Sequence, residues 1–197
     1  MLGLSCREGA GGIHPIMLHT AKAGGPLRLG VVGVGVMGAN HARVLSELSD
    51  VALVGIADCD PKQCAHVSQA LRCPVYNDLE SLIAAGVDAI TIAAPTHLHR
   101  DLALTCIRHG VHILVEKPIA SSVEEGGAII AAAARAGVTL MVGHVERFNP
   151  AVEAVKNAIR NEDILSIAIT RVGPFPPRMS NVGVVIDLAV HDIDLIR

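Results

Sequence analysis

The stretch LRLGVVGVGVMGANHARVL, residues 27–45, decides the fold of this chain. It opens with a short apolar run, typical of a buried strand, and helical spacing of apolar residues follows from residue 39. Between them lies a GxGxxG pattern of Gly33, Gly35 and Gly38, with Val36 and Met37 before the last glycine. Gly33 allows a tight turn, Gly35 lets the backbone approach a pyrophosphate, and Gly38 lets helix and strand pack closely. The pattern predicts a dinucleotide-binding turn whose helix N-terminus faces the phosphates.

Apolar runs and helical segments alternate from this stretch onward. We expect strands at 27–33, 51–58, 74–76, 88–94, 111–116 and 138–143, and helices at 39–48, 61–71, 78–85, 97–109 and 121–136. The strands are apolar on both faces, as in parallel strands that are covered by helices on two sides. The predicted fold class is α/β: a Rossmann, doubly wound parallel sheet, followed by the start of a second α/β domain.

The pattern changes after residue 143. Residues 149–161 are expected to form an amphipathic helix, 164–172 a half-buried strand of a different sheet, and 173–183 a loop rich in Pro and Gly, before a closing helix. One strand cannot make a sheet, so we expect a Rossmann domain at 27–148 and only the beginning of a substrate domain at 149–197. Residues 1–26 lack the apolar region of a signal peptide and are expected to be a disordered lead-in.

The composition disfavours several classes of protein. Of the 197 residues, 51% are hydrophobic and 18% charged, with a net charge of −3 and no basic patch, so neither nucleic acid nor a membrane surface is an expected partner. The five cysteines follow no disulfide framework and suit reduced thiols in a cytoplasmic protein. Cys59, Cys64, His66 and Cys73 include no CxxC pair, so we predict no metal site.

Polar residues follow three of the predicted strands, at the sheet edge where open α/β sheets bind ligands. Asp58 ends the second strand, twenty residues after Gly38. A carboxylate there accepts hydrogen bonds from ribose hydroxyls and repels a 2′-phosphate, which favours NAD over NADP. The motif APTHLH (94–99) ends the fourth strand, and Glu116-Lys117-Pro118 ends the fifth. Partial burial after a strand suits the Lys117 ammonium to act as a hydrogen-bond donor or an acid.

The closing segment GVVIDLAVHDIDLIR (183–197) places Asp187, His191 and Asp194 on one helix face. Two interpretations stay open on this pattern alone. The three side chains are either an ordinary solvated stripe or a functional group of acids and a base.

The chain resembles the glucose–fructose oxidoreductase/inositol dehydrogenase/rhizopine-catabolism (Gfo/Idh/MocA) family of nicotinamide-dependent oxidoreductases. The matching stretches follow one another from residue 27 to 197: GVGVMGANHARVL, GIADCDP, APTHLH, VEKPIA, GHVERFNPAV and GVVIDLAVHDIDLIR. The resemblance implies a Rossmann domain followed by an α/β domain whose open sheet walls the substrate site. It also implies homo-oligomers for the full-length form.

The resemblance implies roles for individual residues. Lys117 matches the catalytic lysine of the family, His191 its general base and Asp187 the partner acid. The dinucleotide site corresponds to the three glycines with Val36 and Met37, to Asp58, and to Pro95, Thr96, His99 and Glu116. The Lys117–Pro118 bond is commonly cis in the family. GHVERFNPAV (143–152) further resembles members that oxidise UDP-N-acetylglucosamine or related nucleotide sugars at C3, although this stretch also lies near the domain hinge.

These implications together give an expected reaction. Hydride leaves a secondary alcohol of a sugar for NAD, His191 takes the hydroxyl proton, and Lys117 stabilises the oxygen. The alternatives are a polyol or inositol dehydrogenase and a nicotinamide-binding module without catalysis. Because members of the family are longer, the chain is expected to be C-terminally truncated and to have little or no activity by itself.

Overall fold

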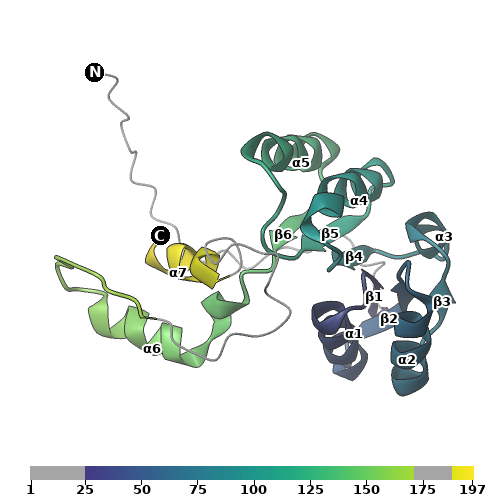
Figure 1. The fold of residues 1–197 in the computed structure, drawn as a ribbon, viewed down its shortest axis with the longest axis horizontal. Helices are drawn as coiled ribbons and strands as arrows, with labels where there is room; N and C mark the ends of the chain where they lie inside the picture. Colours follow the sequence, from purple (N-terminus) through teal and green to yellow (C-terminus); the bar gives the residue numbers. More distant parts are fainter. Residues whose placement is uncertain (1–24, 171–187) are drawn as a thin grey trace.

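The computed structural model describes residues 25–170 and 188–197. Its centre is a six-stranded, wholly parallel sheet with the strand order β3-β2-β1-β4-β5-β6 (Figure 1). The strands are β1 (Leu27–Val32), β2 (Val51–Ala57), β3 (Val75–Tyr76), β4 (Ala89–Ile92), β5 (His112–Val115) and β6 (Leu140–Val142). The order reverses between β1 and β4, as in a doubly wound sheet. The predicted parallel α/β sheet is therefore confirmed, with strand ends shifted by one to a few residues.

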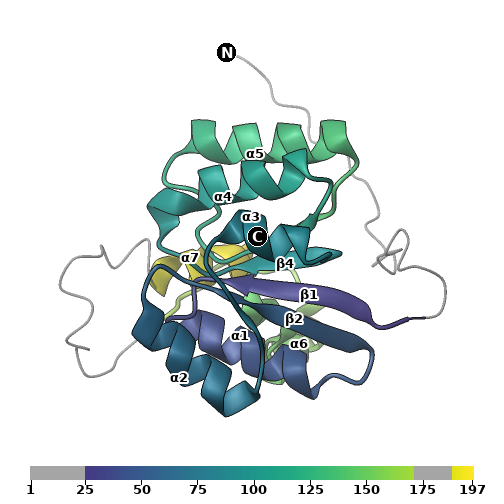
Figure 2. The same cartoon turned by 90° about the vertical axis from the view of Figure 1, so that its right-hand side faces the viewer.

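Five helices cover the two faces of this sheet (Figure 2). They are α1 (Val36–Glu47), α2 (Pro61–Leu71), α3 (Leu79–Ala84), α4 (Thr96–Arg108) and α5 (Val123–Ala136). Helices α3, α4 and α5 lie on one face, and α1 and α2 on the other. Neighbouring strand residues point to opposite faces, so Val31 joins the core beneath α1 and α2, whereas Val32 joins the core beneath the other three helices.

Local capping signals explain where several helices begin. The Asp60 carboxylate accepts from the Lys62 backbone N–H at the start of α2, and Ser122 accepts from Glu125 N–H at the start of α5. At its other end, Gly137 ends α5 in the left-handed region. Helix α1 begins three residues earlier than expected, because its first turn is part of the glycine motif itself.

The region after β6 is organised differently. A 3₁₀ turn, η1 (Val145–Phe148), leads into α6 (Pro150–Ile159), and α7 (Val190–Ile196) lies beside η1. The strand expected at 164–172 is wrong for its described part, because residues 163–170 form neither helix nor strand and all are exposed. A strand is stabilised by hydrogen bonds to a neighbour, and no described strand lies alongside this segment. The predicted loop at 173–183 lies outside the described residues.

Two negative findings apply to the described ranges alone. Within 25–170 and 188–197, no helix is both long and apolar enough to cross a membrane, and no group of three or more His, Cys, Asp or Glu residues could hold a metal ion.

The cysteines in these ranges are unpaired. Burial raises the thiol pKa of Cys64 and Cys73, and it raises the pKa of Cys106 to about 12.

Candidate dinucleotide and catalytic site

The glycine turn after β1 is shaped by close backbone contacts. Gly33 has a φ of +81°, and a Cβ there would lie 2.6 Å from the backbone nitrogen of Ala94. A Cβ on Gly38 would lie 1.7 Å from the carbonyl oxygen of Gly33. Both positions therefore require glycine because of the protein itself. A Cβ on Gly35 would meet no protein atom within 4 Å, so this glycine opens towards free space, where a ligand backbone could approach.

The first turn of α1 borders this open space. Gly35 is its N-cap residue and makes no side-chain cap, so the helix N-terminus presents backbone N–H groups. Val36 and Met37 follow, with 65% and 45% of their surfaces exposed. Exposed apolar residues beside uncapped donors fit a phosphate-bearing ligand that covers this turn.

Asp58 lies where predicted, directly after β2, and it ties two loops together. One carboxylate oxygen accepts from the Val34 backbone N–H at 2.6 Å, and the other accepts from Asp60 N–H at 2.8 Å. The carboxylate thereby fixes the glycine turn against the turn after β2. Each oxygen keeps a further lone pair, so Asp58 can still accept hydrogen bonds from a ligand.

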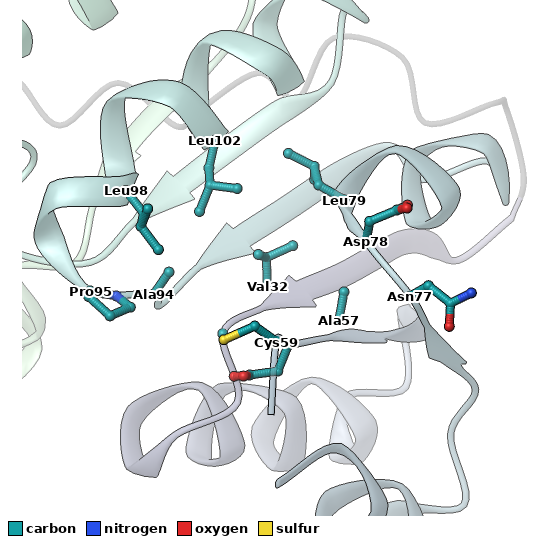
Figure 3. A pocket seen from close by; sticks show the side chains of 12 residues that line it. Val32, Ala57, Cys59, Asn77, Asp78, Leu79, Ala94, Pro95, Leu98 and Leu102 are labelled. Carbon is teal, nitrogen blue, oxygen red and sulfur yellow. The ribbon is translucent and has the colours of Figure 1, made fainter. Parts of the chain in front are cut away.

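Asp58 also borders a cavity of about 260 Å³ at the carboxyl ends of β1, β2 and β4. Figure 3 shows that Leu98 and Leu102 from α4 point into the same space as Val32 and Leu79. The remaining lining residues are Gly33, Ala57, Cys59, Asn77, Asp78, Ala94 and Pro95. An apolar slot with a carboxylate at its rim suits a flat, aromatic ring attached to a polar sugar. The sequence predicted Asp58, Gly33 and Pro95 as site residues but not the leucines, because apolar residues after a strand indicate only a core.

The turn after β4 carries the APTHLH motif. Pro95 is the N-cap residue of α4 and Thr96 its first residue. His99 is 1% exposed, and its ring lies between two carbonyl oxygens, that of Pro118 at 2.9 Å from Nδ1 and that of Ala94 at 2.7 Å from Nε2. His99 thus joins the turn after β4 to the turn after β5 from the interior. A direct contact between His99 and a cofactor stays a prediction.

The turn after β5 carries Glu116 and Lys117. Glu116 is 6% exposed; its Oε1 lies 2.7 Å from Nε2 of His41, and its Oε2 accepts from the Lys117 backbone N–H at 3.1 Å. Burial raises the pKa of Glu116, but the hydrogen bond and charge of His41, with those of Lys117, outweigh it and hold the pKa below its usual range. Lys117 itself is half-buried, and the Lys117–Pro118 bond is cis.

His41 is the polar residue next to Glu116 that the sequence patterns did not predict. It lies on α1, three residues after the last glycine of the motif, and its side chain is 20% exposed. A histidine on a helix does not by itself indicate a functional residue. The signal that identifies it is the partner Glu116, which lies 75 residues away in the chain.

The closing helix contributes His191, which is half-buried on α7. Its neighbours Val190 and Ile193 line a cavity of about 890 Å³ together with Thr96 and Pro118. Helix α7 and the turns that follow β4 and β5 therefore line one cavity. Asp187 lies outside the described residues.

Asp194 was expected on the same helix face as His191, and its contacts are with η1. It accepts from Nε of Arg147 at 2.8 Å and from Nη2 at 2.5 Å, and Nδ1 of His144 is 3.5 Å away. Asp194 therefore ties α7 to the 3₁₀ turn η1.

These features define a dinucleotide-binding α/β protein, in which the buried Glu116 and then Lys117 follow strand β5 directly. Residues 27–144 match the oxidoreductase family with an NAD-binding Rossmann fold that is designated GFO_IDH_MocA, and the chain belongs to this family.

Similar proteins include both nucleotide-sugar and polyol dehydrogenases. The chain is 35% identical over 169 residues to UDP-N-acetylglucosamine 3-dehydrogenase of Acidithiobacillus ferrooxidans, covering 86% of this chain and 53% of that protein. It is 33% identical to inositol 2-dehydrogenase of Rhizobium meliloti, covering 87% and 54%. The chain thus spans about half the length of these relatives.

Solved structures of similar proteins superimpose on most of this chain. The Acidithiobacillus UDP-N-acetylglucosamine 3-dehydrogenase superimposes with a TM-score of 0.76 at 34% identity, over 86% of this chain and 55% of that one. A protein of gentamicin A biosynthesis, GenD2 in complex with NAD, superimposes with a TM-score of 0.75 at 26% identity, over 87% and 52%.

Proposed function

We propose that this chain supplies the cofactor-binding half and the catalytic lysine of an NAD-dependent oxidoreductase that takes hydride from a secondary alcohol of a sugar. The observation that carries the proposal is the common edge of β1, β2 and β5. The glycine turn, Asp58 and Lys117 follow these three strands at their carboxyl ends. Open parallel sheets bind their ligands at this edge.

The residues present fit a dinucleotide. The open side of Gly35 and the uncapped N-terminus of α1 suit a pyrophosphate, and the cavity beside Asp58 suits an adenosine. A ribose hydroxyl can donate to Asp58, whereas a 2′-phosphate would be repelled by its carboxylate, so we propose NAD rather than NADP. When bound, NAD accepts the hydride.

The protein's own residues would handle the proton and the alcohol oxygen. Histidine ordinarily titrates near neutral pH, which suits His191 to take the hydroxyl proton. The Lys117 ammonium would donate a hydrogen bond to the same oxygen and stabilise the negative charge that develops on it. Asp187, one helical turn before His191, would orient the alcohol or pass the proton on.

The relatives favour a sugar or polyol as the substrate. We propose a nucleotide sugar oxidised at C3, because the relative with 35% identity is a UDP-N-acetylglucosamine 3-dehydrogenase. An inositol-type substrate is the second candidate, because the relative with 33% identity is an inositol 2-dehydrogenase. We further propose that the whole protein forms homo-oligomers.

The test is turnover by the whole protein, to which this chain contributes the cofactor-binding half, with NAD and either UDP-N-acetylglucosamine or myo-inositol, followed as formation of reduced cofactor. We expect Lys117→Ala and His191→Ala each to lower the rate by about 10²–10⁴-fold while NAD binding stays intact. The matched control is Lys62→Ala, an exposed lysine on α2, which should leave the rate unchanged. Unchanged turnover in Lys117→Ala would contradict the assignment, and NAD binding without any turnover would favour a non-catalytic module.

A further inference from the structure

The hydrogen bond between His41 and Glu116 has no part in the proton and hydride transfers proposed above. Glu116 is 6% exposed, and its carboxylate side chain is 9% exposed. Its surroundings are tightly built, because a Cβ on Gly143 would lie 3.0 Å from its carboxyl carbon. Burying a carboxylate is costly, so its presence in this turn calls for a physical explanation.

The position of Glu116 in the sheet relates it to one end of a dinucleotide. In a doubly wound sheet the ligand lies across the point where the strand order reverses, which here is between β1 and β4. Asp58 follows β2, on the far side of β1, and so belongs to the adenosine half. Glu116 follows β5, on the opposite side of the reversal, and so belongs to the nicotinamide half.

The two redox forms of the cofactor differ in charge at that half. The oxidised nicotinamide ring carries a positive charge, whereas the reduced ring is neutral. An anion in a poorly solvated site attracts the positive ring and has no comparable attraction for the neutral one. Lys117 and His41 lie near the same carboxylate, so only the removal of the Glu116 charge isolates its contribution.

We propose that Glu116, held in place by His41 and by the Lys117 backbone N–H, makes the site prefer the oxidised over the reduced cofactor. The proposal rests on the proposed NAD site and adds a property that the proposed reaction does not require. Hydrogen bonds from both partners keep the carboxylate from rotating away. Burial keeps water from screening it.

The experiment measures the binding of three ligands to the 197-residue chain: NAD⁺, NADH and ADP-ribose, which lacks the nicotinamide. In Glu116→Gln, which keeps the shape but removes the charge, we expect the Kd for NAD⁺ to rise about tenfold. The Kd for NADH should change by less than about twofold, and that for ADP-ribose should not change. The matched control is Glu47→Gln at the far end of α1, which removes the same charge and should leave all three Kd values unchanged.

The outcomes separate this inference from the proposed function. If the wild-type chain binds none of the three ligands, the proposed NAD site fails and the inference fails with it. If the wild type binds them and Glu116→Gln weakens NAD⁺ and NADH equally, only the inference is overturned. If Glu116→Gln loses ADP-ribose binding through misfolding, Glu116→Met, which is also neutral and of similar length, takes its place: a rise in the Kd for NAD⁺ that exceeds any rise in the Kd for NADH supports the inference, and equal changes overturn it.

Discussion

The region from β1 to β6 and the region after it are stabilised in different ways. The first has a core on each face of its sheet, with Val31, Ile56 and Ile90 fully buried. In the second, the elements η1, α6 and α7 contain no buried residue, and Phe148 is 78% exposed. The first region therefore holds its site residues by its own packing. The second depends on polar contacts such as the one between Arg147 and Asp194.

The proposed catalytic residues Lys117 and His191 belong to different regions of the two. Lys117 follows β5, which lies between β4 and β6 in the packed sheet, whereas His191 lies on α7. Strand β5 contains the buried Ile113 and Val115, whereas α7 contains no buried residue. Cofactor binding should therefore tolerate changes in α7 that would displace the proposed base.

The sharpest test of this comparison is a pair of substitutions by alanine, one in each region. Ile90→Ala removes a fully buried side chain from β4 and should lower the free energy of unfolding by about 2–5 kcal/mol. Phe148→Ala removes a larger side chain from η1, yet most of it already contacts water, so the change should stay within about 0.5 kcal/mol. Urea unfolding followed by circular dichroism measures both values. A Phe148→Ala cost as large as that of Ile90→Ala would contradict the comparison.

The second prediction concerns the ion pair of the packed region. Glu116→Gln should lower the free energy of unfolding by about 1–3 kcal/mol at neutral pH, because it replaces a charged hydrogen bond in a buried place. The folded-state pKa of Glu116 is lowered, so its stabilisation is present above the pKa of the unfolded state and is lost as pH falls through the folded value. The stability difference between wild type and variant should therefore shrink below about pH 4.

Urea titrations of both proteins at neutral and acidic pH provide the measurement. The exposed pair of Arg43 and Glu47 on α1 offers a control, since Glu47→Gln should change stability by less than about 0.5 kcal/mol at either pH. A Glu116 contribution that grows as the pH falls would show that the carboxyl is protonated in the folded chain.

Much of the packed region could be predicted from the sequence because its signals are local. The glycine pattern predicted the turn at Gly33, and alternation of apolar runs predicted all six strands. The region after β6 could not be predicted as well. Its run at 164–170 has strand-like alternation, but a strand depends on a neighbour that no local pattern contains.

The candidate site could likewise be predicted only in part from the sequence. The positions of Asp58 and Lys117 at one sheet edge were predicted because both follow strands directly, and parallel strands bring their ends to one edge. His41 was not, because its importance comes from Glu116, a contact across 75 residues. Asp194 was expected on a face with His191, but its partner Arg147 lies 47 residues earlier. Contacts between distant side chains were therefore the part that sequence patterns left undetermined.

The smallest expected effect concerns that last contact. Asp194→Asn removes the charge that pairs with Arg147; the Asp194 side chain is 8% exposed, but that of Arg147 is 51% exposed, so solvent around the guanidinium limits the cost to ~1 kcal/mol. The hydrogen bond from Arg147 lowers the pKa of Asp194 more than burial raises it, so the contribution is present at neutral pH and is lost as pH falls through the folded-state pKa. Hydrogen exchange of the α7 amides should accelerate in the variant, while exchange in β4 stays unchanged. Equal acceleration in both elements would show that α7 and the sheet unfold together, and the division between the two regions would not hold.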